Sequence, residues 1–374
     1  MILLLARWLS GVPGARLFTY ITFRAALAAI IAFFLCMWLG PRVIAKLREL
    51  GFQDREKDDD ARLAQIWRQT DKKKTPTMGG VFLVPSIMGA VVLCGDLTSV
   101  YVMVGLALAL WYMGIGAIDD WAKLHRRKQG GLSRREKLLW QTVGALAAVA
   151  VLYWYATSTG RSSLLRIYVP FVKNFALDLP AWGLGGAVVY AAFQWFTLVG
   201  TGNAVNITDG MDGLAAGCAL VAGISLAVLC YVAGSPRLAD YFIVPTIQGA
   251  AEMSILAAAL VGGCLGFLWF NCYPAQVFMG DTGSLPLGAM LGYLALVSRQ
   301  ELVLPVIAGI FVVEAGSSYL QIVWFKRTGR RLFPIAPLHH VFQLRQYPEP
   351  KIVIRFWIAA ALLSLAGVAL LKIR

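Results

Sequence analysis

The chain has 374 residues, of which 59% are hydrophobic and only 14% are charged, and its mean hydropathy is +0.67. This composition is too apolar for an ordinary soluble domain, so we expect a protein of the lipid bilayer. The net charge of +14 does not indicate nucleic-acid binding, because the lysines and arginines fall in connectors between apolar segments.

Apolar segments of roughly 16 to 22 residues recur along the chain, the length that a helix needs to cross about 30 Å of hydrocarbon. They favour a helical bundle over a β-barrel, whose strands would alternate over about ten residues. The fold class is therefore an all-α polytopic membrane protein of about ten transmembrane helices. The predicted spans are, in chain order, 21–40, 79–95, 100–118, 138–156, 181–200, 213–233, 254–270, 285–298, 302–325 and 352–371.

No internal repeat and no long linker divides the sequence, so residues 1–374 are expected to form one domain. A cleaved signal peptide is not expected, because Arg7 interrupts the opening apolar run and no cleavage site follows. The six cysteines lie in or beside apolar segments without metal-type spacing, which predicts neither disulfides nor a zinc site.

Lysine and arginine are distributed unevenly between the connectors. There are ten in 41–78, seven in 119–137 and six in 326–351, against none in 96–99, three in 157–180 and one in 234–252. The positive-inside rule then places the rich connectors in the cytoplasm, together with 201–212 and 271–284, and both termini on the periplasmic side. Because these inner connectors also carry the polar motifs, we expect the active site at the cytoplasmic face.

The first polar motif follows the third predicted span. Asp119 and Asp120 are adjacent, and Lys123 is four and three residues further on, so a continued helix would place its ammonium near either carboxylate. Repulsion between the neighbouring carboxylates favours a cation shared between them. A surface ion pair without a function is equally compatible with this motif alone.

The second motif is the polar run from Asn203 to Gly213, in a short connector that needs no such polarity to be soluble. It contains Asn206, Asp209, Gly210, Met211 and Asp212. Asp209 and Asp212 would share a face if a helix begins there. The alternative is plain turn chemistry, because Asn, Asp and Gly dominate turns.

The third motif runs from Asn271 through Phe278 to Ser284 and places Asp281 between two glycines at the entrance of a span. Gly280 and Gly283 would let backbone amides approach a phosphate, and a helix starting near Ser284 would offer free N–H groups to an anion. A simple N-cap is the competing role for Asp281 or Ser284.

The last connector carries His339 and His340 beside Arg330, Arg331 and Arg345. Neighbouring histidines project in different directions, which favours phosphate hydrogen bonding or proton handling over a two-ligand metal site.

Two weaker signals lie elsewhere. Residues 72–80 bring Lys72, Thr77 and two glycines to the mouth of the second span. Glu314 falls inside the ninth span, where a carboxylate needs a partner in the bundle or a structural hydrogen bond.

Aspartates in three inner connectors, together with lysines and histidines but without a nucleotide-hydrolysing P-loop, match what metal-assisted phosphoryl transfer needs. Oxygen ligands suit Mg²⁺, which would neutralise charge as a pyrophosphate bond breaks. A membrane site that faces the cytoplasm suits one water-soluble phosphate substrate and one lipid-bound partner.

The motifs together resemble those of the phospho-N-acetylmuramoyl-pentapeptide transferases, over nearly the whole chain. The matching segments are Thr75-Pro76-Thr77-Met78-Gly79-Gly80, Asp119-Asp120 with Lys123, 206–213, 278–284, Ala336-Pro337-Leu338-His339-His340 and 348–357. The resemblance implies transfer of phospho-MurNAc-pentapeptide from its UDP carrier to undecaprenyl phosphate, which gives lipid I and UMP with Mg²⁺. It also implies a ten-helix fold in the bacterial inner (cytoplasmic) membrane, a homodimer, and no nucleic-acid partner.

The resemblance also implies roles for individual residues. Asp281 would hold the metal, Asp119 and Asp120 would act on the lipid phosphate or support the metal, and His339 and His340 would contact the sugar-phosphate side. The substrate-binding residues would be Lys72, Thr77, Lys123, Asn206, Asp209, Gly210, Met211, Asp212, Asn271 and Phe278. Direct attack by the lipid phosphate and a covalent phospho-enzyme are both compatible with these residues.

One departure from the family pattern is that Val341 stands where a third consecutive histidine is usual, and residues 342–345 also differ from the usual acidic and lysine-bearing pattern. Sugar or peptide recognition is expected to be altered there. The nearest rival function is transfer of N-acetylglucosamine 1-phosphate to the same lipid. A secondary transporter is a more remote one, since it would place ionisable groups near the midplane and show repeats.

Overall fold

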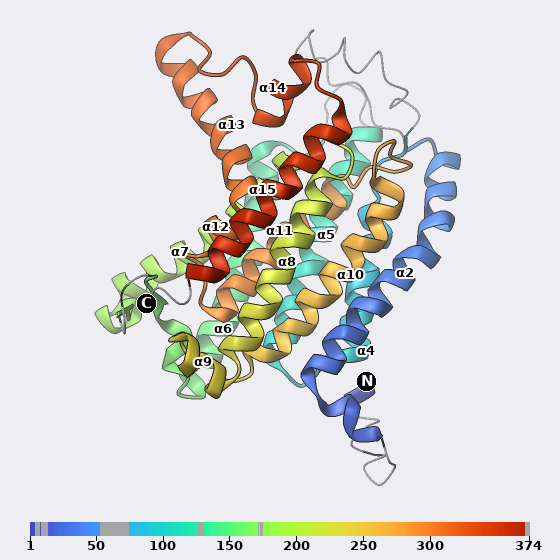
Figure 1. The fold of residues 1–374 in the computed structure, drawn as a ribbon. Coiled ribbons are helices and arrows are strands. Elements are labelled where there is room, and N and C mark those ends of the chain that lie inside the picture. The colour runs from blue at the N-terminus through green and yellow to red at the C-terminus, as the bar shows by residue number, and fades with distance from the viewer. Residues whose placement is uncertain are drawn as a thin grey trace.

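The apolar segments fold into helices that run between the two ends of one bundle (Figure 1). The computed structural model describes residues 1–3, 8, 14–52, 75–125, 131–170, 172 and 175–370. The long helices and the two segments of the ninth span are α2 (Ile21–Glu49), α4 (Gly80–Cys94), α5 (Val100–His125), α6 (Arg134–Ser158), α7 (Leu184–Thr208), α8 (Leu214–Ala233), α10 (Met253–Asn271), α11 (Asp281–Ser298), α12 (Leu304–Ile307), α13 (Gly309–Thr328) and α15 (Glu349–Ala369).

Short elements fill the connectors. They are the 3-10 helices η1 (Ala15–Thr19), η3 (Ser162–Leu165), η4 (Leu179–Trp182) and η5 (Ala250–Glu252), the α-helices α9 (Pro236–Phe242) and α14 (Leu338–Leu344), and the strands β1 (Ile167–Tyr168) and β2 (Ala176–Leu177). The two strands pair antiparallel, with Ile167 opposite Leu177 and Tyr168 opposite Ala176. The all-α prediction is confirmed, and this two-residue pairing is the only sheet among the described residues.

Each predicted span coincides with helix, but the ninth is not continuous. We expected one helix over 302–325, whereas α12 ends at Ile307 and α13 begins at Gly309. Ala308 between them leaves the helical conformation, with φ −95° and ψ 28°. A second correction concerns the polar C-terminal ends of α5 and α7, which extend further than the predicted spans. Residues 201–208 are the last two turns of α7 rather than part of a connector, and α5 continues past the apolar segment to His125.

Helix α11 lies at the centre of the bundle and is buried at every position from Asp281 to Ser298. It packs against α4, α5, α7 and α8. Its neighbours rather than hydrocarbon surround it, so the polar residues of its first turn are shielded from lipid. Asp281, the first residue of α11, is buried among the neighbouring helices. Residues from several helices can therefore contact it, as an active site requires.

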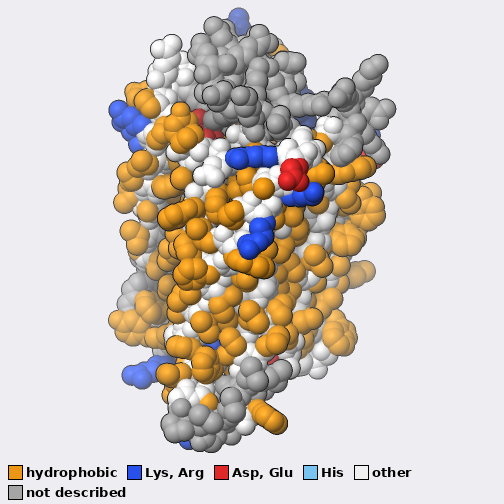
Figure 2. Space-filling view, turned by 90° about the vertical axis from the view of Figure 1, so that its right-hand side faces the viewer, with side chains coloured by type: hydrophobic (Ala, Val, Ile, Leu, Met, Phe, Trp, Pro, Cys, Tyr) orange, Lys and Arg blue, Asp and Glu red, His pale blue; other side chains and the backbone are white. Residues whose placement is uncertain are grey.

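Seven helices in the described part of the chain are long and apolar enough to cross a membrane: α2, α5, α6, α7, α8, the η5–α10 segment and α15. Hydrophobic side chains cover the middle of the face shown in Figure 2, while Lys and Arg gather toward its upper part. On α2 the exposed apolar residues include Ile30, Phe34 and Trp38. Such a broad apolar surface fits contact with lipid rather than with water.

The polar connectors meet at one end of the bundle, where α14 lies, and the N-terminus and α9 lie at the other (Figure 1). Hydrogen bonds join these connectors directly. Gly79 N donates to Phe278 O at 2.8 Å, and Asp212 N donates to the Glu349 carboxylate at 2.9 Å. Segments that lie far apart in the sequence thus form one polar end.

Candidate active site

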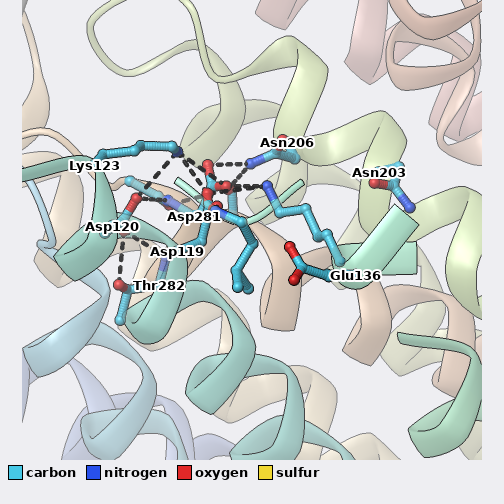
Figure 3. A network of polar contacts seen from close by, with 12 residues as sticks. Asp119, Asp120, Lys123, Glu136, Asn203, Asn206, Asp281 and Thr282 are labelled. Atoms are coloured by element: carbon cyan, nitrogen blue, oxygen red, sulfur yellow. Dashed lines mark hydrogen bonds and ion pairs between the residues drawn. The ribbon is translucent and has the colours of Figure 1, made fainter. Parts of the chain in front are cut away.

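Three carboxylates come together at this end. Asp119 and Asp120 lie in the last two turns of α5, and Asp281 is the first residue of α11 (Figure 3). One oxygen from each lies within 4.8 Å of the others. Helix α5 can approach α11 this closely because residue 116 is glycine, since a Cβ there would overlap the main-chain carbonyl of Asp281.

Two lysines compensate the negative charge of this cluster. Lys123 Nζ lies 2.7 Å from Oδ2 of Asp119, 3.2 Å from Oδ2 of Asp281 and 3.4 Å from Oδ1 of Asp120. Lys137 Nζ, from the first turn of α6, lies 3.2 Å from Oδ2 of Asp119 and also contacts Oδ2 of Asp281. Without these cations three neighbouring carboxylates would repel one another strongly in a site of low dielectric.

Asp120 is fixed by the start of α11 rather than turned toward open space. Its Oδ2 accepts hydrogen bonds from Thr282 N at 2.9 Å and from Thr282 Oγ1 at 2.7 Å, and its Oδ1 accepts from Asp281 N at 3.2 Å. The first N–H groups of a helix have no partner within the helix, and they favour a negative charge. The anion that we expected at this helix start is thus a side chain of α5, and it sets the position of Asp281.

Asp119 and Lys137 are positioned by the residues that begin α6. Asp119 Oδ1 accepts a hydrogen bond from Leu132 N at 2.7 Å. Next along the chain, Ser133 and Glu136 form a capping box, in which each side chain bonds the other's backbone N–H. The helix that starts there carries Lys137 in its first turn and directs its ammonium at the carboxylates.

Helix α7 contributes an amide on the other side of Asp281. Asn206 Nδ2 lies 2.7 Å from Asp281 Oδ1 and 2.9 Å from Ser284 Oγ. One turn earlier, Asn203 Nδ2 donates to Gln141 Oε1 of α6 at 2.7 Å. This bond holds α6 against α7, so that Lys137 and Asn206 reach the same carboxylate from two helices. Figure 3 shows Asn206 directed at Asp281.

A second polar group surrounds the turn after α7. Asp212 Oδ2 accepts from Ala275 N at 3.1 Å. Asn271 accepts from Gly213 N at 3.0 Å and donates to Val277 O at 2.8 Å. Met211 is buried, whereas Asp209 and Gly210 are half-buried. The two predicted substrate segments, 209–213 and 271–278, are therefore joined by hydrogen bonds.

Phe278 is half-buried, and its backbone is bonded to the segment before α4. Its N–H donates to Pro76 O at 2.8 Å, and Thr77 N donates to Phe52 O at 2.8 Å. The predicted residue Lys72 lies outside the described residues. The part of this motif that the structure describes thus borders the 271–278 segment.

The two histidines lie on α14. His339 is fully buried and bonds Glu314 of α13, with Nδ1 at 2.9 Å from Oε2. His340 is half-buried, with Nδ1 at 2.7 Å from Gln343 Oε1. Its position in the ninth span suggested that Glu314 needs a partner in the bundle. That partner is His339.

The structure brings Asp119, Asp120, Lys123, Asn206 and Asp281 into one cluster, and it places the 209–213 and 271–278 segments beside each other. His339 belongs to a separate contact with Glu314. Lys137 is the residue of the cluster that sequence reasoning did not single out, because it was counted as one of the topological charges of connector 119–137. Lys137 directly follows the Ser133–Glu136 pair, which is typical of a helix N-terminus, and this position could have identified it.

The donor set fits a hard divalent cation. All three side chains of the acidic cluster offer carboxylate oxygens, and these atoms are close enough to share one ion. Asp281 is the member whose position is set from three sides, by Lys123, Lys137 and Asn206. A dication here would take over part of the charge compensation that the two ammonium groups provide.

Two family models match this chain. Residues 102–299 match the model of glycosyl transferase family 4, and residues 72–84 match signature 1 of the phospho-N-acetylmuramoyl-pentapeptide-transferases. The first match spans more than half of the chain and includes the whole acidic cluster. The chain therefore belongs to glycosyl transferase family 4, as a membrane phospho-sugar transferase of the phospho-N-acetylmuramoyl-pentapeptide-transferase type.

Proposed function

We propose that the protein transfers phospho-MurNAc-pentapeptide from UDP-MurNAc-pentapeptide to undecaprenyl phosphate, which gives lipid I and UMP. The observation that carries this proposal is the cluster of Asp119, Asp120 and Asp281, with two lysines, in a chain that bears the family signature. Two phosphate-bearing substrates need a site that stabilises negative charge. Lysines and a metal at one polar end of a membrane bundle provide it.

We assign Mg²⁺ to Asp281, with Asp119 and Asp120 close by. When bound, the ion would polarise the pyrophosphate oxygens and neutralise the charge that develops as the bond to UMP breaks. Lys123 and Lys137 then orient and stabilise the phosphates. Asp119 is the carboxylate available to take a proton from, or to orient, the lipid phosphate. Asp120 acts mainly through its bonds to the first turn of α11.

The nucleotide-sugar side is assigned to the hydrogen-bonded segments 209–213 and 271–278, with His340, Lys72 and Thr77. Their joined backbone supports a rigid surface for the uridine diphosphate. This end of the bundle faces the cytoplasm of the bacterial inner membrane in our proposal, and both termini face the periplasm. We also propose a single domain and a homodimer.

The test is UMP release by purified protein in detergent with undecaprenyl phosphate and Mg²⁺. UDP-MurNAc-pentapeptide and UDP-N-acetylglucosamine are supplied in parallel reactions. UMP from the muramoyl substrate alone supports the proposal. UMP from the other sugar alone makes this the N-acetylglucosamine 1-phosphate enzyme. No UMP from either substrate, from protein whose thermal unfolding is cooperative, contradicts both.

A further inference from the structure

Glu314 and His339 form a buried pair that the mechanism above does not use. Both side chains are fully buried, Glu314 on α13 and His339 on α14. Glu314 accepts two bonds from this one residue: Oε1 accepts from the backbone N–H at 3.1 Å, and Oε2 lies 2.9 Å from Nδ1. A carboxylate that is hydrogen-bonded to both the backbone N–H and the ring of one histidine fixes the orientation of the ring.

The same contact selects a tautomer. An ionised carboxylate can only accept hydrogen bonds, so the proton of the imidazole must lie on Nδ1. The other ring nitrogen, Nε2, is then a hydrogen-bond acceptor in the neutral ring and a donor in the charged ring. In families with histidine at a reactive site, such a partner on the far nitrogen determines what the near nitrogen can do.

Nε2 of His339 has no hydrogen-bond partner in the described structure, although it is buried. It faces Gly210: a Cβ built on that residue would lie 2.5 Å from Nε2. A buried ring nitrogen without a hydrogen-bond partner costs free energy, so such an atom is kept for a reason or is satisfied in another state. Gly210 lies in the 209–213 segment, which we assign to the nucleotide-sugar side.

We propose that Glu314 is a positioning residue, which holds His339 with Nδ1 protonated so that Nε2 is presented to a phosphate or sugar oxygen bound at the 209–213 segment. This inference rests on the proposed function. The ring reaches that ligand when the turn at Gly210 shifts on substrate binding, because Nε2 is covered in the structure described above. Glycine at position 210 places no side chain against Nε2.

The first readout needs no substrate. The chain has three histidines, so ¹⁵N-labelled imidazoles can be assigned by single replacements of His125 and His340. The expected His339 signal is that of a ring protonated at Nδ1. In Glu314→Gln the amide keeps the shape of the side chain, but its NH₂ donates to the ring when its oxygen accepts from the backbone. The proton then moves to Nε2.

The second readout is turnover, with Glu314→Gln, Glu314→Asp and the control Ser317→Ala. Ser317 is buried one turn further along α13, and its described hydrogen bond is to the backbone carbonyl of Glu314, at 2.8 Å. We expect Glu314→Gln to lower kcat by about 100-fold or more. Glu314→Asp, which keeps the carboxylate, should recover part of the loss, and Ser317→Ala should stay near the wild-type rate.

Gly210→Ala supplies an independent variant, because its methyl group would push against Nε2 while Glu314 stays intact. It should lower kcat and leave the Nδ1 proton in place. The proposal is overturned if wild-type His339 carries its proton on Nε2, or if Glu314→Gln moves the proton and keeps wild-type turnover. If the wild-type protein releases no UMP, the proposed function fails, and the ¹⁵N signals still decide whether Glu314 sets the tautomer.

Discussion

Lys137 of α6 and Asp281 of α11 form an ion pair although 144 positions separate them in the sequence. The same ammonium lies 3.2 Å from Asp119, so one lysine bridges two of the three clustered carboxylates. Since its side chain is largely buried, the contact is shielded from solvent and salt far better than a surface ion pair. The acidic cluster is therefore held together by its own cations before any ligand binds.

Replacing that bridging lysine should impair the reaction. In Lys137→Met the apolar stem is kept and the charge is lost, so two carboxylates lose a shared counter-ion and a phosphate loses a partner. We expect turnover to fall by about 100-fold, as measured by UMP release. Lys46→Met is the matched control, because Lys46 pairs with Glu49 at an exposed site. Equal rates for the two variants would contradict the role of Lys137.

The carboxylates of Asp281 and Asp119 should each be essential. Asp281→Asn and Asp119→Asn keep the side-chain volume. The first removes the negative charge that would bind the cation, and the second removes the carboxylate that would accept a proton. Turnover is expected to drop by orders of magnitude in each variant, while thermal unfolding in detergent remains cooperative. Near-normal rates in both would remove the assigned roles.

Binding of a divalent cation should depend on Asp281. A ligand that binds only the folded protein stabilises it by about 2.7 kcal/mol at one hundred times its Kd. We therefore expect Mg²⁺ to raise the Tm of the wild-type protein, a chelator to reverse the shift and abolish UMP release, and Asp281→Asn to show neither response. A Tm rise of equal size in that variant would place the ion elsewhere.

Asp120 should differ from its neighbour by affecting stability. Asp120→Ala leaves the N–H groups of Asp281 and Thr282 and the Thr282 hydroxyl without their acceptor. Because each unsatisfied buried group costs roughly 1–3 kcal/mol, a loss of about 3 kcal/mol or more is expected. The Tm in detergent measures it. Asp119→Ala serves for comparison, since its carboxylate accepts one described backbone bond, from Leu132.

A buried ion pair at the opposite end should matter for stability alone. Arg24 of α2 is 2% exposed, pairs with Glu252 through both its terminal nitrogens, and donates to Cys94 O at 3.0 Å. Glu252→Gln removes one charge of the pair and should cost about 3–5 kcal/mol of unfolding free energy. The folded fraction should keep wild-type turnover per molecule. A selective loss of kcat without a change in Tm would contradict this separation.

The spans could be predicted from the sequence because length and hydropathy are local properties. The break at Ala308 and the pairing of β1 with β2 could not, since each depends on a few backbone torsions that tertiary packing decides. The aspartates were identifiable because, unlike Lys and Arg in the connectors, paired carboxylates and Asn-Asp-Gly motifs beside apolar spans have no topological explanation. Lys137 was not, because lysine at the end of a basic connector has a topological explanation, and only its contact with Asp281 in the folded protein distinguishes it.

The close approach of α5 and α11 at Gly116 has a consequence for inhibitors. The spacing between Asp119 and Asp281 is set by two main chains in contact and not by flexible side chains alone. A molecule that mimics the phosphates would then meet a surface that needs little reorganisation, so more of its interaction energy would remain as affinity. Resistance by a larger side chain at position 116 would distort the acidic cluster itself, which makes that position a costly route of escape.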